Sequence, residues 1–395
     1  MRQIEQASID SLALLKFYTR YIGMVSANTS KAFLVVALVS FLAMAAWPAK
    51  KKKEDETQVL QLPKELPNAV TGETRRLTFY VTPLSAKGRL SQQVRDGLKA
   101  LERQASGNTV LKIRAFVAGT GDLRRVRDLV SETFGERRQP LPALSLIQAG
   151  GLPLEGAQVV LEGIAASKRD LYPGGLAFFS AQPEYADNPL DSVAPLAAKS
   201  LAALRQALQA VPVDAASVLR ITCFLSSLEN LEATRQLAQP AYPRAALNYV
   251  QTQRAPARAM AACEAVAGLR GDSRGRLEVL NPGGLAPIEG VSRIALVGAP
   301  HLVLSGTQVS FGYEEADARL AFGRLAKALE PLGASLRDVA FAHIYPLSRK
   351  IADEVQSVER SFFDPAHPPA GTTILMEGLS SLDAGFAVDV VAAKD

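Results

Sequence analysis

The sequence predicts an α+β protein made of three similar units, and three observations support this fold class. Three apolar runs resemble one another: VLKIRAFVAG from Val110, VLRITCFLSS from Val218 and VAFAHIYPLS from Val339. They lie roughly 110 to 120 residues apart, which is a domain spacing and too long for a solenoid repeat. Each run follows a stretch with the apolar spacing of a helix that buries one face. The helical stripes are Val94, Leu98 and Leu101; Leu201, Leu204 and Leu208; and Phe322, Leu325 and Leu329.

The remaining elements of each unit follow in the same order. A second helical stretch comes after each run, in DLRRVRDLVSETF, LENLEATRQLA and ADEVQSVERSFF. A proline loop and two strands follow, and the opening strands lie in LTFYVTP, LAFFSAQ and LVLSGTQ. The unit is therefore strand, helix, strand, helix, strand, strand. The expected organisation is an amino-terminal extension with a signal or anchor over 1–49, a charged linker over 50–74, and domains at 75–166, 167–272 and 273–395.

Composition indicates a globular chain with enough apolar residues for several cores. The 395 residues carry a formal charge of +5, and apolar residues make up 48% of them. Four of the lysines form one run, Lys50 to Lys53, and no basic cluster with interleaved aromatic residues stands out elsewhere. Nucleic-acid binding is therefore disfavoured.

The amino terminus differs in kind from the rest of the chain. Residues 32–47 are almost entirely apolar and precede the lysine run. This segment is shorter than the roughly twenty residues of a typical spanning helix and suits a secretion signal, with Ala43-Met44-Ala45 as a cleavage site. The following lysines would instead favour an uncleaved anchor. We expect an extracytoplasmic protein, periplasmic or secreted, or one anchored to the membrane, with a buried core helix as the alternative.

The two cysteines cannot form a disulfide framework. Cys223 and Cys263 each lie in an apolar, strand-like run. The favoured interpretation is a pair of small buried apolar residues, with a single disulfide or a reactive thiol as alternatives.

Strand patterns indicate how the three units meet. In VLRITCFL, Leu219, Ile221, Cys223 and Leu225 form one face, which we expect to cover the helices. The other face mixes apolar and polar residues, as do the corresponding faces of the other two runs. Those faces carry Val110, Lys112, Arg114 and Phe116; Val218, Arg220, Thr222 and Phe224; and Val339, Phe341, His343 and Tyr345. A half-apolar second face is best explained by packing against another sheet.

Each unit resembles a degenerate copy of the RidA (YjgF-like) family. The third copy carries the resemblance most clearly, in LVLSGTQ, LEPLGASLRDVAFAHIYPLS, FFDPAHPPAGTTILMEGL and FAVDVVA. The resemblance covers most of residues 75 to 395. It implies chorismate-mutase-like α+β sandwich domains, and three copies in one chain imply a monomeric pseudo-trimer with pseudo-threefold symmetry. In the family, ligand sites lie in the three clefts between subunits.

The resemblance also implies a chemistry, the hydrolysis of 2-imino or enamine acids to keto acids and ammonia. The family holds the substrate carboxylate with an arginine in a P-x-R-[ST] loop, because a guanidinium meets a carboxylate with two hydrogen bonds. The first and third copies place Leu144 and Gly371 at this position. The second copy has Arg244 directly after Pro243, without the spacer and the following Ser or Thr, and Arg244 is the candidate for binding a substrate carboxylate. Arg258, in the string APAR, lies too near Glu264 to be that arginine.

The family's glutamate on the last strand is also missing. Its position is taken by Val160, Ala262 and Ala387, none of which can move a proton. The neighbouring carboxylates Glu162, Glu264 and Asp389 are interpreted as partners within the assembly. An opening-strand serine that lines the family's cleft is matched by Ser180 and Ser305.

Other chemistry has little support in the sequence. His301, His343 and His367 are too dispersed for a local zinc motif, so no metal and no cofactor are expected. His343 is interpreted as an interface residue. The PGGLA strings at 173–177 and 282–286 do not open helices and are interpreted as turns.

Two functions remain open from the sequence. The first is a pseudoenzyme that binds a small molecule or acts as a scaffold after losing its catalytic groups. The alternative is a surviving imine or enamine deaminase at one inter-domain cleft around Arg244, with a small carboxylic or imino acid as the ligand. Loss of the arginine in two copies and of the glutamate in all three favours the first.

Overall fold

The structure is a computed structural model that describes residues 63–119, 122–271 and 275–395. These residues belong to one compact unit, Leu62–Asp395. The apolar segment 32–47 and the lysine run lie outside the described residues. Among the described helices, none has both the length and the apolar character needed to cross a membrane.

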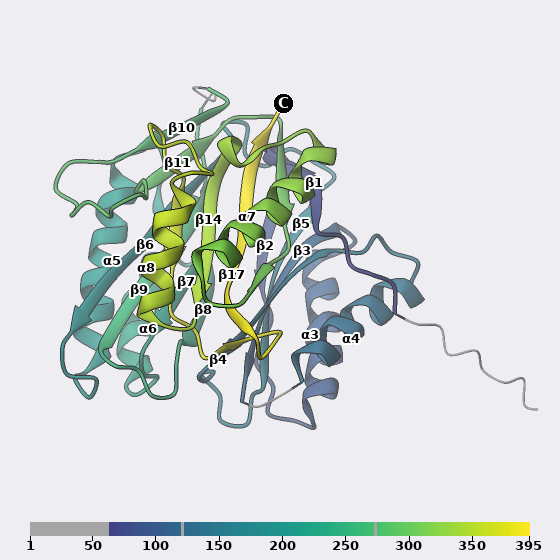
Figure 1. Ribbon diagram of the computed structural model, residues 1–395, viewed down its shortest axis with the longest axis horizontal. Coiled ribbons are helices and arrows are strands. Elements are labelled where there is room, and N and C mark those ends of the chain that lie inside the picture. The colour runs from purple at the N-terminus through teal and green to yellow at the C-terminus, as the bar shows by residue number, and fades with distance from the viewer. Residues whose placement is uncertain (1–62, 120–121, 272–274) are drawn as a thin grey trace, which may run out of the picture. The chain divides into compact units, whose positions relative to one another are not determined.

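The described residues alternate strands and helices, and the α+β class is confirmed (Figure 1). The helices are α3 (Leu90–Ala105), α4 (Leu123–Glu136), α5 (Val193–Gln209), α6 (Leu231–Ala241), α7 (Glu315–Leu329) and α8 (Arg349–Glu359). The strands are β1 (Ala69–Glu73), β2 (Leu77–Val81), β3 (Thr109–Ala118), β4 (Ala143–Ala149), β5 (Val159–Ala166), β6 (Leu176–Ala186), β7 (Val218–Leu225), β8 (Ala246–Gln251), β9 (Ala259–Gly268), β10 (Leu277–Leu280), β11 (Ile294–Val297), β12 (His301–Ser305), β13 (Gln308–Phe311), β14 (Val339–Pro346), β15 (Ala370–Thr373), β16 (Gly378–Leu379) and β17 (Ala384–Lys394).

Local side chains fix where several helices begin. The Asp122 carboxylate accepts hydrogen bonds from two backbone N–H groups at the start of α4. The Ser348 hydroxyl does the same for the Ile351 N–H at the start of α8. Such caps satisfy N–H groups that have no partner within the helix. The Ser348 cap places Arg349 at the first position of α8.

The described strands form three sheets that share one strand order. The first sheet has the order β16-β4-β3-β5-β2, the second β10-β11-β6-β9-β7-β8, and the third β1-β12-β17-β14-β15, with β13 also paired to β17. In each sheet a long central strand (β3, β7 or β14) has a parallel neighbour on one side. Its other neighbour is the antiparallel last strand of the same unit (β5, β9 or β17). The order of elements predicted for each unit is therefore present three times.

Each central strand also carries an irregularity at the same place. The register shifts after Val110 in β3, after Val218 in β7 and after Val339 in β14. Such a bulge places two consecutive residues on one face, so the residues before it lie on the face opposite to the one that strict alternation predicts. The valines consequently pack under the helices, and Leu219 packs toward the other sheets. The faces predicted for Val110, Val218, Leu219 and Val339 were therefore wrong, although Ile221, Cys223 and Leu225 do face the helices.

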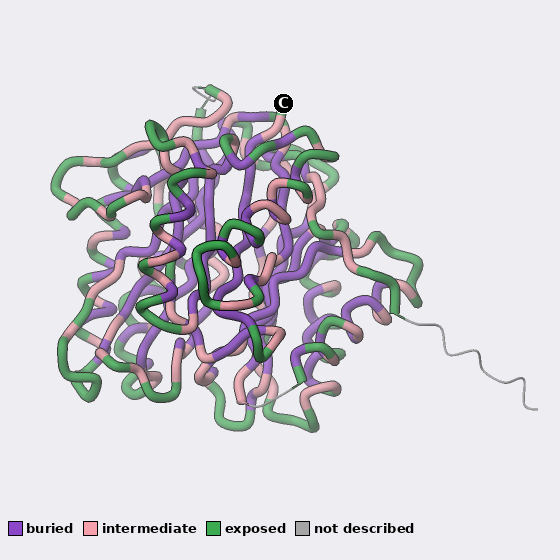
Figure 2. Tube along the Cα trace, in the orientation of Figure 1, coloured by how far each residue is buried: buried purple, intermediate pink, exposed green. Residues whose placement is uncertain are grey.

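The apolar core has two kinds of cluster. Three clusters each join one sheet to its own pair of helices. Two further clusters contain side chains from all three sheets, including Phe79, Phe178 and Phe341 in one and Phe116 and Phe224 in the other. Figure 2 shows this as buried strands inside and helices with exposed outer faces. The mixed strand faces are thus covered by one another, as the sequence predicted.

Strand pairing crosses the domain boundaries expected from the sequence. β1, which lies within the expected linker 50–74, pairs with β12 of the third sheet. β10 and β11, which lie within 273–395, extend the edge of the second sheet through β6. The boundaries themselves stay a prediction, but these edge strands bind to sheets of other units.

The two cysteines form a disulfide. Cys223 and Cys263 lie opposite each other on the antiparallel strands β7 and β9, and both are fully buried. The favoured interpretation of two unbonded apolar residues is therefore corrected, because strand pairing brings together residues that are 40 positions apart. The sequence alone did not give that register.

Candidate functional site

A layer of charged and polar side chains lies between the two apolar clusters that the sheets share. We call it the central polar layer; it consists of Lys112, Arg114, Glu162, Arg220, Thr222, Glu264, His343 and Asp389, all at most 5% exposed. Its three acidic residues occupy one register. Glu162 lies opposite Arg114, Glu264 opposite Thr222, and Asp389 opposite His343. Each sheet therefore contributes one carboxylate at the same level.

Ion pairs and hydrogen-bond contacts in this layer connect every pair of sheets. Arg114 donates to Glu162 at 2.7 Å within the first sheet and to Glu264 of the second sheet at 2.8 Å. Lys112 of the first sheet pairs with Asp389 of the third. His343 lies 3.1 Å from Glu264 and 3.2 Å from Asp389. The interpretation of the three carboxylates and His343 as partners within the assembly agrees with these contacts.

The electrostatics of this layer are those of compensated buried charges. Burial acts to raise the pKa of Asp389, but the facing charges of Lys112 and His343 outweigh it and hold that pKa well below its usual range. The pKa of Glu264 is lowered in the same way, against burial, by His343 and Arg114. The free space there is a cavity of about 20 Å³. That is room for about one water molecule and none for an organic substrate.

The positions matched to the family's arginine can be compared through the parallel strand pairs. Leu144 lies opposite Ile113, and Gly371 lies opposite Ala342. The corresponding partner of Ile221 in the second sheet is Leu247, three residues after Arg244. Arg244 instead lies in the exposed turn that precedes β8. The structure therefore places Leu144, Leu247 and Gly371 at the equivalent position and puts Arg244 elsewhere.

The positions matched to the family's glutamate lie in an apolar cluster. Val160, Ala262 and Ala387 are at most 2% exposed and belong to the cluster that contains Phe116 and Phe224. They also share a register, opposite Phe116, Phe224 and Tyr345. None of them can move a proton there.

The two candidate serines have different surroundings. The Ser180 hydroxyl donates to the Ser292 carbonyl at 2.5 Å and accepts from the Gly371 N–H at 2.8 Å. Ser305 is also buried, but it accepts from Val390 N–H at 2.8 Å within its own sheet. The structure thus brings Ser180 and Gly371 together across the second and third sheets and leaves Ser305 away from them.

Gly371 occupies a place with little room for a side chain. A Cβ there would lie 2.8 Å from the Ala342 carbonyl oxygen of the neighbouring strand. Real Cβ contacts are longer, so any other residue would have to displace the backbone of β14 or β15. This explains why a glycine suits the end of the proline loop.

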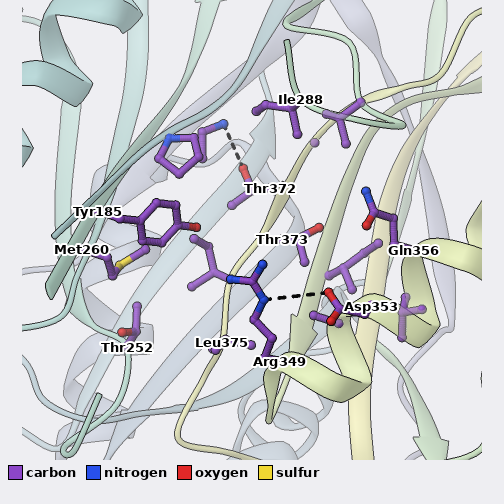
Figure 3. Close-up of a pocket in the computed structure, with 18 of the residues that line it drawn as sticks. Tyr185, Thr252, Met260, Ile288, Arg349, Asp353, Gln356, Thr372, Thr373 and Leu375 are labelled. Atoms are coloured by element: carbon purple, nitrogen blue, oxygen red, sulfur yellow. Dashed lines mark hydrogen bonds and ion pairs between the residues drawn. The ribbon is translucent and has the colours of Figure 1, made fainter. Parts of the chain in front are cut away.

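A cavity of about 410 Å³ opens beside Gly371, between the second and third sheets. We call it the α8 cavity. One wall is α8, and the other walls come from β6, β9, β15 and the loop before β11. Most of the lining is apolar, including Pro183, Met260, Ile288, Val355 and Leu375 (Figure 3). The α8 cavity is larger than two other cavities of about 20 Å³ and about 120 Å³, and its volume is enough for a small organic ligand.

Two arginines reach the open part of the α8 cavity. Figure 3 shows the Arg349 guanidinium pointing inward, with Asp353 on one side and Tyr185 on the other. Its nearest Asp353 oxygen lies at the limit of ion pairing, 4.0 Å away. Arg258 stacks over the Tyr185 ring at 5.0 Å and donates to Asp187 at 3.0 Å. The ion pair of Arg349 with Asp353 is therefore longer than that of Arg258 with Asp187, which makes Arg349 the arginine more available to a ligand.

A carboxyl group lies at the other end of the α8 cavity. Glu359 is only 5% exposed, and burial raises its pKa to about 8, although the neighbouring Arg360 acts to lower it. No hydrogen bond or ion pair joins this carboxyl to any residue that the structure describes. Sequence reasoning missed both Arg349 and Glu359. They look like ordinary charged positions of an amphipathic helix, and their surroundings come from strands far away in the chain.

A metal site has no support in the described part of the chain. Within it, no three His, Cys, Asp or Glu side chains are grouped as metal ligands would be. His343 is occupied by the central polar layer, and His367 lies at the surface beside Asp364. The expectation that the protein uses no metal or cofactor stays a prediction.

Comparisons with known proteins give matches to part of the chain only. No family model and no curated protein matches it. Similar solved structures include a Rid-family protein of unknown function from Yersinia pestis, with 19% identity, 30% of this chain, 100% of that chain and a TM-score of 0.29. A YjgF-family member from Mycobacterium tuberculosis is 22% identical, and the match covers 30% of this chain and 99% of that chain, with a TM-score of 0.23. A YjgF-family member from Neisseria meningitidis is 15% identical, and the match covers 30% of this chain and 95% of that chain, with a TM-score of 0.23.

These three structural neighbours are RidA (YjgF) family proteins, and each matches about 30% of the present chain. With these identities and TM-scores, no activity can be transferred from them to this chain.

Proposed function

We propose that the chain is a covalent pseudo-trimer of three RidA-like units that binds one small organic carboxylate, in the α8 cavity, without the family's catalytic groups. The shared strand order, the register shift after Val110, Val218 and Val339, and the two apolar clusters built from all three sheets support the pseudo-trimer. The strand order and the register shift recur once per unit, as expected of three copies of one ancestral domain, and the two shared clusters join the three units into one core.

The observation that carries the binding proposal is the Arg349 guanidinium in the α8 cavity. The position of the family's arginine is Gly371 in this cleft, so its strand supplies no charge. Arg349 supplies a guanidinium from the opposite wall, on α8. The Arg349 guanidinium favours a carboxylate, because it can donate two charge-assisted hydrogen bonds to one and its own contact with Asp353 is long, at 4.0 Å.

The same geometry argues against a surviving deaminase around Arg244. That reaction needs a bound carboxylate, an attacking water and a group that moves protons. Arg244 is exposed in the turn before β8 and does not line the α8 cavity. Val160, Ala262 and Ala387 are buried among apolar side chains. Binding without turnover is therefore better supported than a deaminase. If the protein binds no ligand, the alternative is a pseudoenzyme that acts as a scaffold.

Export or membrane attachment remains part of the proposal. It rests on the sequence of residues 32–47 and the lysines that follow. The Cys223–Cys263 disulfide gives independent support, since disulfides persist mainly in oxidising compartments outside the cytosol. Intact mass of native material from fractionated cells tests it, and a full-length chain in the cytosol would contradict it.

Calorimetric titration of 2-oxobutanoate tests the binding proposal. We expect one site per chain and at least tenfold weaker binding for Arg349→Ala, since a charge-assisted hydrogen bond contributes about 1.5–3 kcal/mol. Lys350→Ala is the matched control, because it removes the adjacent positive charge of α8 from a side chain that does not line the cavity. Arg244→Ala should bind like the wild type.

Four results would contradict the binding proposal. A stoichiometry near three would mean equivalent clefts, and dependence on Arg244 would restore the sequence-based site. Turnover in an imine-hydrolysis assay would restore the deaminase. Absence of binding and turnover would leave the scaffold.

A further inference from the structure

The α8 cavity extends along one face of a helix from an exposed cation to a buried carboxyl group. The lining residues of α8 include Arg349, Asp353, Gln356 and Glu359. Their spacing of four, three and three residues places them on one helical face. The Arg349 end is open to solvent, because the Arg349 side chain is 75% exposed and that of Asp353 is 67% exposed. The Glu359 end is closed, since Glu359 is 5% exposed.

The Glu359 carboxyl faces the cavity without a partner among the described residues. Its Oε1 approaches the backbone at Gly290, in the loop before β11, where an added Cβ would lie 3.6 Å away. The nearest cation, Arg360, is engaged elsewhere and donates to Glu289 of that loop at 2.5 Å. Gln356 donates to the Glu289 carbonyl oxygen. Arg360 and Gln356 are therefore both bonded to Glu289 and not to the Glu359 carboxyl.

A buried carboxyl in this position holds a proton when the cavity is empty. It is the last residue of α8, where the partial negative charge of the helix end disfavours a carboxylate. Burial adds to this and raises the pKa of Glu359 to about 8. An ammonium group placed beside it would stabilise the ionised form, because opposite charges close together in a poorly solvated site attract strongly. Binding of an ammonium would therefore release the proton.

The two ends of the cavity are separated by a definite length. The Arg349 guanidinium lies beside Asp353, and the six residues from Asp353 to Glu359 correspond to a helical rise of about 9 Å. The wall between them is largely apolar, with Val355 on α8 and Ile288 opposite. A ligand that contacts both ends must therefore carry its charges several ångströms apart on an uncharged chain.

We infer that the ligand of the α8 cavity is a linear amino-carboxylate whose carboxylate pairs with Arg349 and whose ammonium pairs with Glu359. This rests on the proposed function and names its substrate class. Triglycine, whose charged ends are about 10 Å apart when extended, and 6-aminohexanoate, at about 8 Å, have suitable lengths. Free glycine is too short to reach both groups. A short peptide and an ω-amino acid both carry an ammonium at one end and a carboxylate at the other. Comparing the affinities of triglycine and 6-aminohexanoate shows which of the two classes the cavity prefers.

Titration calorimetry with matched ligands tests the inference on the full chain. Hexanoate and 6-aminohexanoate have the same length and carboxylate but differ in the terminal amine. At pH 7 we expect 6-aminohexanoate to bind at least tenfold more tightly than hexanoate and to release close to one proton, measured from the binding enthalpy in buffers of different ionisation enthalpy. Below its pKa, the Glu359 carboxyl must lose a proton before it can pair with the ammonium, so the affinity of 6-aminohexanoate should rise from pH 6 to pH 8. Above pH 8 the carboxyl is already ionised in the free protein, and the affinity should level off.

Glu359→Gln keeps the shape and hydrogen-bonding capacity of the protonated side chain and should fold normally. In this variant we expect the advantage of 6-aminohexanoate and its proton release to disappear, while hexanoate binds as before. Equal affinities in the wild type, or proton release that persists in Glu359→Gln, would overturn the inference and leave the carboxylate site intact. If neither hexanoate nor 6-aminohexanoate binds, both the inference and the proposed site fail. Tighter binding of triglycine than of 6-aminohexanoate would identify a peptide.

Discussion

The backbone N–H of Gly371 donates a 2.8 Å hydrogen bond to the Oγ of Ser180. These residues lie 191 positions apart, on strands of the third and second sheets. The same hydroxyl donates to the Ser292 carbonyl, and Ser292 N–H in turn donates to the Pro369 carbonyl. Ser180 therefore fixes the proline loop of one unit against the opening strand of another, beside the α8 cavity.

Ser180→Ala should destabilise the protein. It leaves the buried Gly371 N–H without its acceptor, and such a loss costs about 1–3 kcal/mol. Denaturant unfolding measures this change. Ser357→Ala is the control: its exposed hydroxyl donates only to Glu354 of the same helix, so its effect should stay within about 0.5 kcal/mol. Equal effects of the two substitutions would mean that the Ser180 contact has no special weight.

Arg114→Met should have a larger effect, because Arg114 pairs with carboxylates of two sheets. Its removal leaves Glu162 and Glu264 buried with less compensating charge, and breaking such a buried pair costs about 3–5 kcal/mol. Arg319→Met removes an arginine from an exposed pair with Glu315 and should cost less than about 1 kcal/mol. Urea unfolding of the two variants checks this. A loss below 1 kcal/mol for Arg114→Met would contradict the importance of the central polar layer.

The central polar layer should also make the protein sensitive to acid. The pKa values of Glu162, Glu264 and Asp389 are lowered in the folded state, so the folded protein binds fewer protons than the unfolded chain in acid. This contribution to stability is complete above the ordinary carboxyl pKa of about 4 and is lost as the pH falls below it. Urea unfolding from pH 7 to pH 2.5 should show the decline. In Arg114→Met the decline should be shallower, and an unchanged slope would contradict this assignment.

Light scattering should show that residues 62–395 form a monomer. The mixed faces of the three sheets already cover one another, so no second chain is needed to bury them. A fragment that begins at residue 75 would lose β1, which pairs with β12, and should be less stable because it exposes that strand edge. A stable trimer of chains would contradict the covalent pseudo-trimer.

Sequence reasoning reached the features that depend on local pattern. Helical spacing at Val94, Leu98 and Leu101 and the recurring strand runs were enough for the α+β class and the order of elements, because periodicity reports which face is buried. The interpretation of His343 as an interface residue also followed from its place on a mixed strand face.

Features that depend on strand register could not be reached in this way. Arg244 directly follows a proline, without the spacer of the family's P-x-R-[ST] loop, and parallel pairing places Leu247, not Arg244, opposite Ile221. The Cys223–Cys263 bond likewise depends on which residues of β7 and β9 lie opposite each other. The roles of Arg349 and Glu359 arise only when the second sheet packs beside α8. A helix sequence does not show which of its charged residues will face a cavity.

The most direct test of the central claim is a crystal structure of the protein with bound 2-oxobutanoate. We expect one ligand per chain, in the α8 cavity, with its carboxylate on the Arg349 guanidinium and no ligand at Arg244. Density at three equivalent positions beside Leu144, Leu247 and Gly371, or a ligand held by Arg244 with the α8 cavity empty, would contradict it.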